Sequence, residues 1–148
     1  MGNRTAKAII LTGVIFAATG TWVLAAAQKS SGQNVARGKY LVEEVAKCTE
    51  CHTPRDKNNQ LIRGQWLQGA PIWIQPVVKT ANWADSAPKL AGLPNYTDEQ
   101  VMRVLTAGVN AEGKPIQPPM HIYHMNKADA AAIVAYLRSL SAAAPTQQ

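Results

Sequence analysis

Apolar residues recur at three- to five-residue steps between residues 35 and 48, a spacing that predicts an amphipathic helix. The charged residues between them can face water. The apolar positions of this predicted helix are Ala36, Tyr40, Leu41, Val45 and Cys48. Gly38 lies inside the segment, where glycine costs about 1 kcal/mol of helix stability relative to alanine. It marks either a close crossing with another helix or a point of fraying.

Two further helices are predicted toward the C-terminus. Thr97 and Gln100 have the pattern of a capping box, and Gly108 is a typical C-terminal stop. Asn126 is the predicted N-cap of the last helix, whose small alanines permit close packing on the first. The apolar stripe of this last helix consists of Ala130, Ile133, Val134, Leu137 and Leu140.

Residues 55–96 have little periodicity, and prolines divide them into short pieces. Irregular segments of this length are uncommon in small domains. The chain also has few bulky side chains for a domain of its size, so its own core is modest. We therefore expect the domain to pack around something in addition to its own side chains.

Residues 1–27 have the pattern of a segment that directs export. Basic residues precede an uncharged run from Ala8 to Gln28. The run is either a signal peptide that is cut after Ala27 or a retained membrane anchor, since about 20 apolar residues cross a bilayer. A basic N-terminus stays inside, so both alternatives place the rest of the chain outside the cytoplasm.

The remaining organisation is simple. A polar linker is predicted at residues 28–34, a single domain at 35–141 and a flexible tail at 142–148. The 148-residue chain has a formal net charge of +6, with both signs mixed along the sequence, so nucleic acid is not an expected partner. The excess positive charge either steers an acidic protein partner or only keeps the protein soluble.

The strongest motif is Cys48-Thr49-Glu50-Cys51-His52, which contains both cysteines of the chain. C-x-x-C-H is typical of c-type haem attachment, with two thioether links and the histidine as the proximal iron ligand. A thioredoxin-like redox pair would need a strand and helix pattern that is missing around the motif. A structural zinc site would need about four ligands. We therefore predict one covalently attached haem c, held by Cys48, Cys51 and His52.

The second iron ligand is less constrained. The candidate residues are Met102, Met120, His121, His124 and Met125. Met102 lies within a predicted helix and Met125 directly before a helix cap, so both are assigned to packing. Met120 follows two prolines in the loop between two helices and is the predicted distal ligand, in line with the usual His/Met ligation of cytochromes c. His121, the next residue, is the alternative.

These stretches resemble the class I cytochromes c, and more closely the cytochrome c subunits of bacterial membrane dehydrogenases. The similar stretches are residues 36–41, 48–54, 119–120 and 129–140. The resemblance implies an all-α fold, a small cytochrome c domain whose N- and C-terminal helices cross over one covalently bound haem. It implies that Gly38 and Tyr40 meet the last helix. The expected partners there are Ala132, Ala135 and Tyr136.

The expected function is single-electron transfer at the periplasmic side of a bacterial inner membrane. The protein would carry electrons from a quinol-oxidising complex or dehydrogenase to an acceptor such as an oxidase. Its expected partners are redox proteins, and the membrane if the N-terminal segment stays uncut. No small-molecule substrate is expected, because the chain has no nucleophile with a paired base and no phosphate-binding glycine loop. The alternatives are a fixed subunit of a membrane-bound dehydrogenase, or a haem enzyme or gas sensor with an open distal site.

Overall fold

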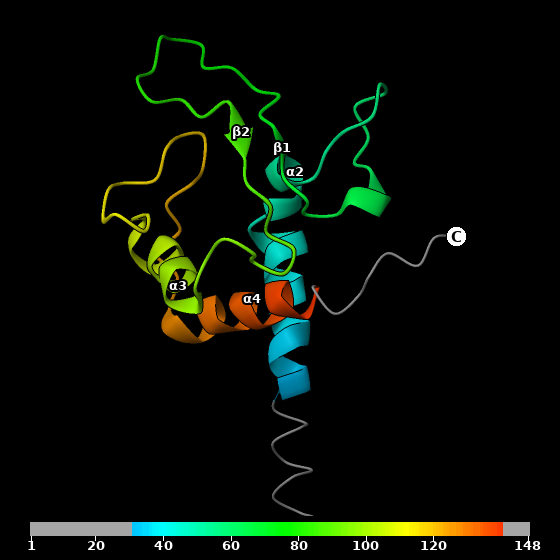
Figure 1. Cartoon of the computed structure of the whole chain (residues 1–148), viewed down its shortest axis with the longest axis vertical. Helices are drawn as coiled ribbons and strands as arrows, with labels where there is room; N and C mark the ends of the chain where they lie inside the picture. The colour runs from blue at the N-terminus through cyan, green and yellow to red at the C-terminus, as the bar shows by residue number, and fades with distance from the viewer. Residues whose placement is uncertain (1–30, 141–148) are drawn as a thin grey trace, which may run out of the picture. The chain divides into compact units, whose positions relative to one another are not determined.

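The computed structural model of this protein describes residues 31–140 (Figure 1). The predicted leader or anchor at residues 1–27 and the predicted tail at 142–148 lie outside the described residues. Between residues 31 and 140, no helix combines the length and the apolar character that crossing a bilayer requires.

The first described helix differs from its prediction at both ends. Residues 31–40 are α-helical, so the end of the predicted polar linker 28–34 belongs to a helix. The chain then continues as a π-helix, η1 (Leu41–Val45), and not as a regular α-helix. Lys47, at a left-handed φ of 51°, separates η1 from a short helix, α2 (Cys48–His52).

The π-turn changes which side chains face the core. The N–H of Ala46 donates to the carbonyl of Leu41 at 2.8 Å, and this bond takes one more residue into the turn than an α-helix does. Leu41 and Val42 are buried, whereas Tyr40 is 52% exposed and Val45 54% exposed. Ala36 is exposed as well, so the predicted apolar face of this helix was wrong at Ala36, Tyr40 and Val45.

The two C-terminal helices match their predictions. Helix α3 (Asp98–Ala107) begins with the predicted capping box at Thr97, and Gly108 ends it at a φ of 67°. Helix α4 (Lys127–Ser139) begins at Asn126, whose side chain accepts a backbone N–H of the first turn. Both helices pack against each other (Figure 1), and α4 also contacts η1.

Helix α4 crosses the first helix at Gly38, which confirms the close-crossing interpretation. A Cβ atom on Gly38 would lie 1.9 Å from the carbonyl oxygen of Ala132 and 2.8 Å from Cβ of Tyr136. The two backbones therefore approach more closely than any residue with a side chain allows. Tyr40, the other residue expected at this crossing, instead lies at the surface with the guanidinium of Arg37 over its ring at 5.8 Å.

A carboxylate takes part in this crossing, which the sequence pattern did not predict. Glu43, on η1, accepts hydrogen bonds from the hydroxyl of Tyr136 and from the indole N–H of Trp66, the latter at 3.2 Å. Burial and the bond to Glu43 raise the pKa of Tyr136, so its hydroxyl stays a donor. The helical period placed Glu43 toward water, because both of its donors come from distant parts of the chain.

A short sheet corrects the prediction of an all-α fold. Strand β1 (Ala70–Pro71) pairs antiparallel with β2 (Ser86–Ala87). The segment between α2 and α3 also contains one short 3₁₀ helix, η2 (Arg63–Gln65), and is otherwise irregular, as predicted. The domain is therefore mostly helical, with a two-stranded sheet in its middle region.

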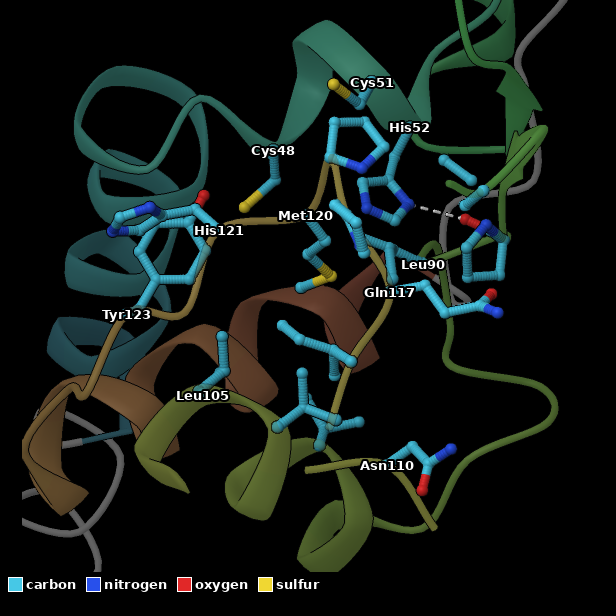
Figure 2. Close-up of a pocket in the computed structure, with 18 of the residues that line it drawn as sticks. Cys48, Cys51, His52, Leu90, Leu105, Asn110, Gln117, Met120, His121 and Tyr123 are labelled. Carbon is cyan, nitrogen blue, oxygen red and sulfur yellow. Dashed lines mark hydrogen bonds between the residues drawn. The ribbon is translucent and has the colours of Figure 1, made fainter. Parts of the chain in front are cut away.

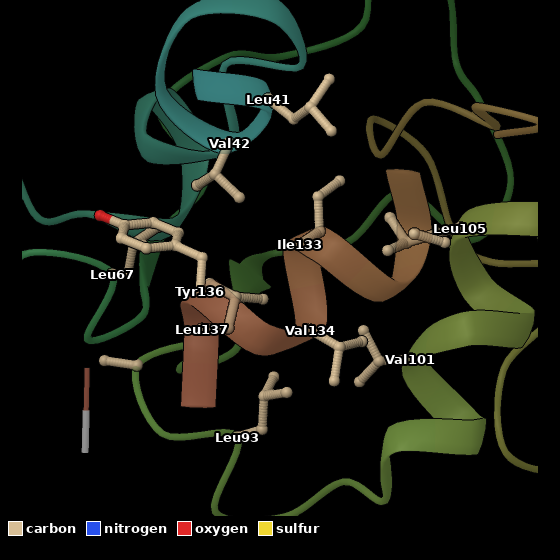
Figure 3. Close-up of a cluster of buried hydrophobic side chains, with 12 residues drawn as sticks. Leu41, Val42, Leu67, Leu93, Val101, Leu105, Ile133, Val134, Tyr136 and Leu137 are labelled. Atoms are coloured by element: carbon tan, nitrogen blue, oxygen red, sulfur yellow. The ribbon is translucent and has the colours of Figure 1, made fainter. Parts of the chain in front are cut away.

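The buried core is centred on the C-terminal helices (Figure 3). Its members are Leu41, Val42, Leu67, Ala91, Leu93, Val101, Leu105, Ala130, Ile133, Val134, Tyr136 and Leu137. Most of these residues belong to α3 and α4. The middle region contributes few of them, so its conformation depends on contacts outside this core.

We expect Gly38→Ala to lower the free energy of unfolding by about 1–3 kcal/mol, the usual cost of overpacking. The added Cβ would meet the backbone of α4, which cannot rotate away as a side chain does. Denaturant unfolding of the purified protein measures the change. Gly32→Ala, in the same helix with no atom within 4 Å, is the matched control and should gain up to about 1 kcal/mol. Equal stability of the two variants would contradict the close crossing.

Candidate functional site

A cavity of about 1180 Å³ lies beside α2 (Figure 2). This volume is somewhat larger than the roughly 300–1,000 Å³ that small-molecule and cofactor pockets usually have. Its walls come from α2, α3, α4 and two loops, residues 81–90 and 110–123. Large apolar side chains in the lining are Ile72, Leu90, Val101, Val104, Leu105, Ile116, Ile133 and Leu137. The cavity therefore suits a large, mainly apolar group.

Helix α2 presents both cysteines of the motif to this cavity. Cys48 and Cys51 are three residues apart, so they lie on the same face of the helix. Both are free thiols. Burial raises the pKa of Cys48 to about 11, and burial together with Glu50 raises the pKa of Cys51. Redox-active C-x-x-C pairs have the opposite shift, so this environment does not support a thiol–disulfide function.

His52 is oriented by the backbone of a distant loop. His52 is only 6% exposed, and its Nδ1 lies 2.7 Å from the carbonyl oxygen of Pro88. A carbonyl only accepts hydrogen bonds, so Nδ1 carries the proton and Nε2 keeps a lone pair for a metal. Burial also lowers the pKa of His52, which favours the neutral imidazole that a metal ligand requires.

The small sheet holds Pro88 in place. Pro88 directly follows β2, and Gly69 directly precedes β1. The N–H of Gly69 donates to the carbonyl of His52 at 2.8 Å, while the hydroxyl oxygen of Thr53 accepts the N–H of Leu67 at 3.0 Å. The strand pair therefore connects the backbone of His52 on one side to the acceptor of its ring on the other.

Two of the five candidates for the second iron ligand line the same cavity. Met120 is half-buried, and its side chain points into the cavity between α2 and α3 (Figure 2). The carbonyl of Pro118 accepts the N–H of Ala84 at 2.7 Å, which attaches the segment before Met120 to the loop after β1. His121 also lines the cavity but is exposed, and its ring meets Tyr123 edge to face with 4.9 Å between centroids.

The other three candidates lie elsewhere. Met102 and Met125 pack against the hydrophobic core, in agreement with the packing roles predicted for them. His124 is exposed and has a left-handed φ of 49°. Among residues 31–140, no three His, Cys, Asp or Glu side chains converge as a metal cluster.

Two features of the site were not found from the sequence. The hydroxyl of Tyr123 donates to the carbonyl of Ala46 at 2.8 Å, and burial raises the pKa of Tyr123 to about 12, so it remains a donor at neutral pH. Arg55 forms an ion pair with Glu50 inside the motif and lies over the ring of Trp73 at 4.8 Å. The contacts of Tyr123 with Ala46 and of Arg55 with Trp73 join residues far apart in sequence, and no local pattern indicates such pairs.

These residues fit a covalently attached haem. Two free thiols one helical turn apart, a neutral imidazole with a free Nε2 and a thioether all line one cavity with apolar walls. This donor set is the one that c-type attachment and His/Met ligation require.

A family of known proteins matches most of this chain. Residues 35–141 match the cytochrome c family. The match covers more than half of the chain, so the chain belongs to the cytochrome c family. It is an electron-transfer cytochrome, and the family implies that its cofactor is haem c.

Three curated proteins that are similar to this chain are all several times longer than it. The chain is 34% identical over 119 residues to the fructose dehydrogenase cytochrome subunit of Gluconobacter japonicus, covering 76% of this chain and 23% of that protein. It is 31% identical over 83 residues to the cytochrome c subunit of the quinone alcohol dehydrogenase of Gluconobacter oxydans, covering 53% of this chain and 17% of that protein. A diheme cytochrome c-type protein of Cereibacter sphaeroides is 49% identical over 35 residues, covering 24% of this chain and 12% of that protein. The chain thus spans less than a quarter of the length of these relatives.

We expect Gly69→Ala to displace the acceptor of His52. Gly69 has a φ of 87°, and an added Cβ would lie 2.9 Å from the backbone nitrogen of Lys89 and 3.0 Å from the carbonyl oxygen of Ala87. Both contacts flank Pro88. The variant should lose about 1–3 kcal/mol of stability, and its reduced absorption spectrum should broaden as the ring of His52 loses its fixed orientation.

Gly113→Ala is the matched control for backbone strain. Gly113 has a similar φ of 75° but no atom within 4 Å of an added Cβ. Alanine is strained at both positions because φ is positive there. Only the Cβ added at residue 69 also meets neighbouring backbone atoms. A Gly69→Ala protein with the spectrum and stability of Gly113→Ala would show that the strand pair does not position His52.

Proposed function

We propose that this protein is a monohaem electron carrier in which one haem is bound through Cys48 and Cys51. His52 is its proximal iron ligand and Met120 its distal ligand. The convergence of these four side chains on a single apolar cavity carries the proposal. When bound, the haem supplies one-electron chemistry, with the iron alternating between the ferrous and ferric states.

The protein's own residues hold the two sides of the site in fixed positions. On the proximal side, the Pro88 carbonyl accepts the proton of Nδ1 and so reserves Nε2 of His52 for the iron. On the distal side, the hydrogen bond at Pro118 fixes the segment that carries Met120. Apolar walls limit the access of water, which favours a higher reduction potential. Two permanent ligands leave no position for a substrate, so the proposed role is electron transfer and not catalysis.

The proposed location is the periplasmic side of a bacterial inner membrane. The basic residues and uncharged run at residues 1–27 support export, either as a cleaved signal peptide or as a retained anchor. The proposed partners are redox proteins, namely a quinol-oxidising complex or dehydrogenase as donor and a downstream acceptor such as an oxidase. The formal net charge of +6 supports partners with acidic docking surfaces.

A second candidate is a fixed electron-transfer subunit of a membrane-bound dehydrogenase. The printed names of two relatives, both cytochrome subunits of dehydrogenases, favour it. Affinity purification of the tagged full-length protein from its native membranes distinguishes the two. Recovery of stoichiometric large subunits supports the fixed subunit, and a monomer supports the mobile carrier.

The ligand proposal is tested by absorption spectroscopy of the ferric holoprotein. We expect Met120→Ala to abolish the weak sulfur-to-iron band at the red edge of the spectrum and to lower the reduction potential, because a thioether ligand stabilises ferrous iron. His121→Ala, a change at the neighbouring residue of the same loop, should retain the band. Loss of the band in His121→Ala and its retention in Met120→Ala would reverse the assignment.

Carbon monoxide tests the open-site alternative. The reduced wild-type protein should bind carbon monoxide slowly or not at all, because Met120 occupies the distal position. Met120→Ala should bind it rapidly. Rapid binding by the wild-type protein would instead support a haem enzyme or gas sensor.

A further inference from the structure

Tyr123 connects the two segments that carry the proposed haem ligands. It follows Met120 by three residues, and its hydroxyl donates a 2.8 Å hydrogen bond to the carbonyl of Ala46. Ala46 precedes Cys48 by two residues. The aromatic ring of Tyr123 lines the cavity, so the connection runs along the cavity wall (Figure 2).

The carbonyl of Ala46 can accept this bond because the helix ends at Ala46. Ala46 ends η1, and its own N–H is used in the bond to Leu41. Lys47 then turns the chain with a left-handed φ of 51°, so the carbonyl of Ala46 does not continue a helical ladder. Tyr123 therefore attaches the loop that carries Met120 to the turn at Ala46 and Lys47, directly before the cysteine motif.

The same residue also holds His121. The rings of His121 and Tyr123 meet edge to face, with their centroids 4.9 Å apart and their planes at 76°. His121 is exposed, whereas Met120 is half-buried and points into the cavity. Exchange of Met120 for His121 at the iron would require this ring contact to break and the backbone between Met120 and Tyr123 to turn.

We propose that Tyr123 is a positioning residue that selects Met120 over His121 as the distal iron ligand. Its hydroxyl fixes the loop to Ala46, and its ring keeps the imidazole of His121 at the surface. The inference rests on the proposed function, because it assumes a haem with Met120 as its distal ligand. It goes further by naming the residue that decides between two adjacent ligands.

The test is the ligation state of the full-length ferric holoprotein with Tyr123→Phe, which keeps the ring and removes only the hydroxyl. Low-temperature electron paramagnetic resonance separates thioether-ligated from imidazole-ligated iron. A urea series below the unfolding transition makes a minor form measurable in the wild-type protein. We expect the ratio of imidazole-ligated to thioether-ligated iron to rise about two- to tenfold at each urea concentration, as the loss of one hydrogen bond predicts.

Two further variants separate ligand selection from general loosening. In Tyr123→Phe/His121→Ala, the imidazole form should disappear and the thioether form should return, because the competing ligand is gone. Tyr96→Phe also alters a tyrosine that lines the cavity, but one without a bond to Ala46, and it should leave the ratio unchanged.

Three results would overturn the inference. An unchanged ratio in Tyr123→Phe would show that the hydroxyl has no role in ligand choice. A new form that persists in the double variant would show a structural effect without His121. A wild-type protein that already lacks the thioether form would refute the distal ligand in the proposed function itself, which the other two results leave intact.

Discussion

The hydrogen bond from Nδ1 of His52 to the carbonyl of Pro88 is the interaction on which the site depends. It sets the tautomer of the proximal ligand and fixes the plane of its ring. It also gives a reason for the conformation of residues 55–96, which have little regular secondary structure. The two short strands, Gly69 and the buried Thr53 all serve to bring one backbone carbonyl to one ring nitrogen. The irregular middle region is thus the support of the proximal side of the cavity.

The crossing at Gly38 supports helix α4, which contributes residues to the cavity wall. Gly38 lets the first helix and α4 approach to backbone contact, and Glu43 binds both Tyr136 and Trp66 at the same place. Helix α3 packs on α4 and contributes apolar residues to both the core and the cavity. The core continues into the cavity wall, because four of its members also line the cavity, namely Val101, Leu105, Ile133 and Leu137. A buried haem would therefore serve as part of the hydrophobic core as well as the redox centre.

Local sequence signals predicted the features that depend on neighbouring residues. The motif at Cys48–His52, the capping box at Thr97 and the apolar stripe of α4 are all patterns within one or a few turns, and the last two are confirmed. The π-turn was missed because it changes the period of a helix without a clear residue signature. The bond of His52 to Pro88 and the bond of Tyr123 to Ala46 each join distant segments, so only the folded chain shows them. The short sheet was missed because its two-residue strands are too short for an alternating pattern.

The proposed function requires that Cys48 and Cys51 attach one haem permanently beside His52. Mass spectrometry of the purified protein after denaturation and tryptic digestion tests it most directly. Trypsin cuts after Lys47 and Arg55, so both cysteines fall in one peptide, residues 48–55. We expect this peptide to carry the mass of one haem after acid and organic extraction. Recovery of the peptide with two unmodified cysteines, or of haem in the extract, would contradict it.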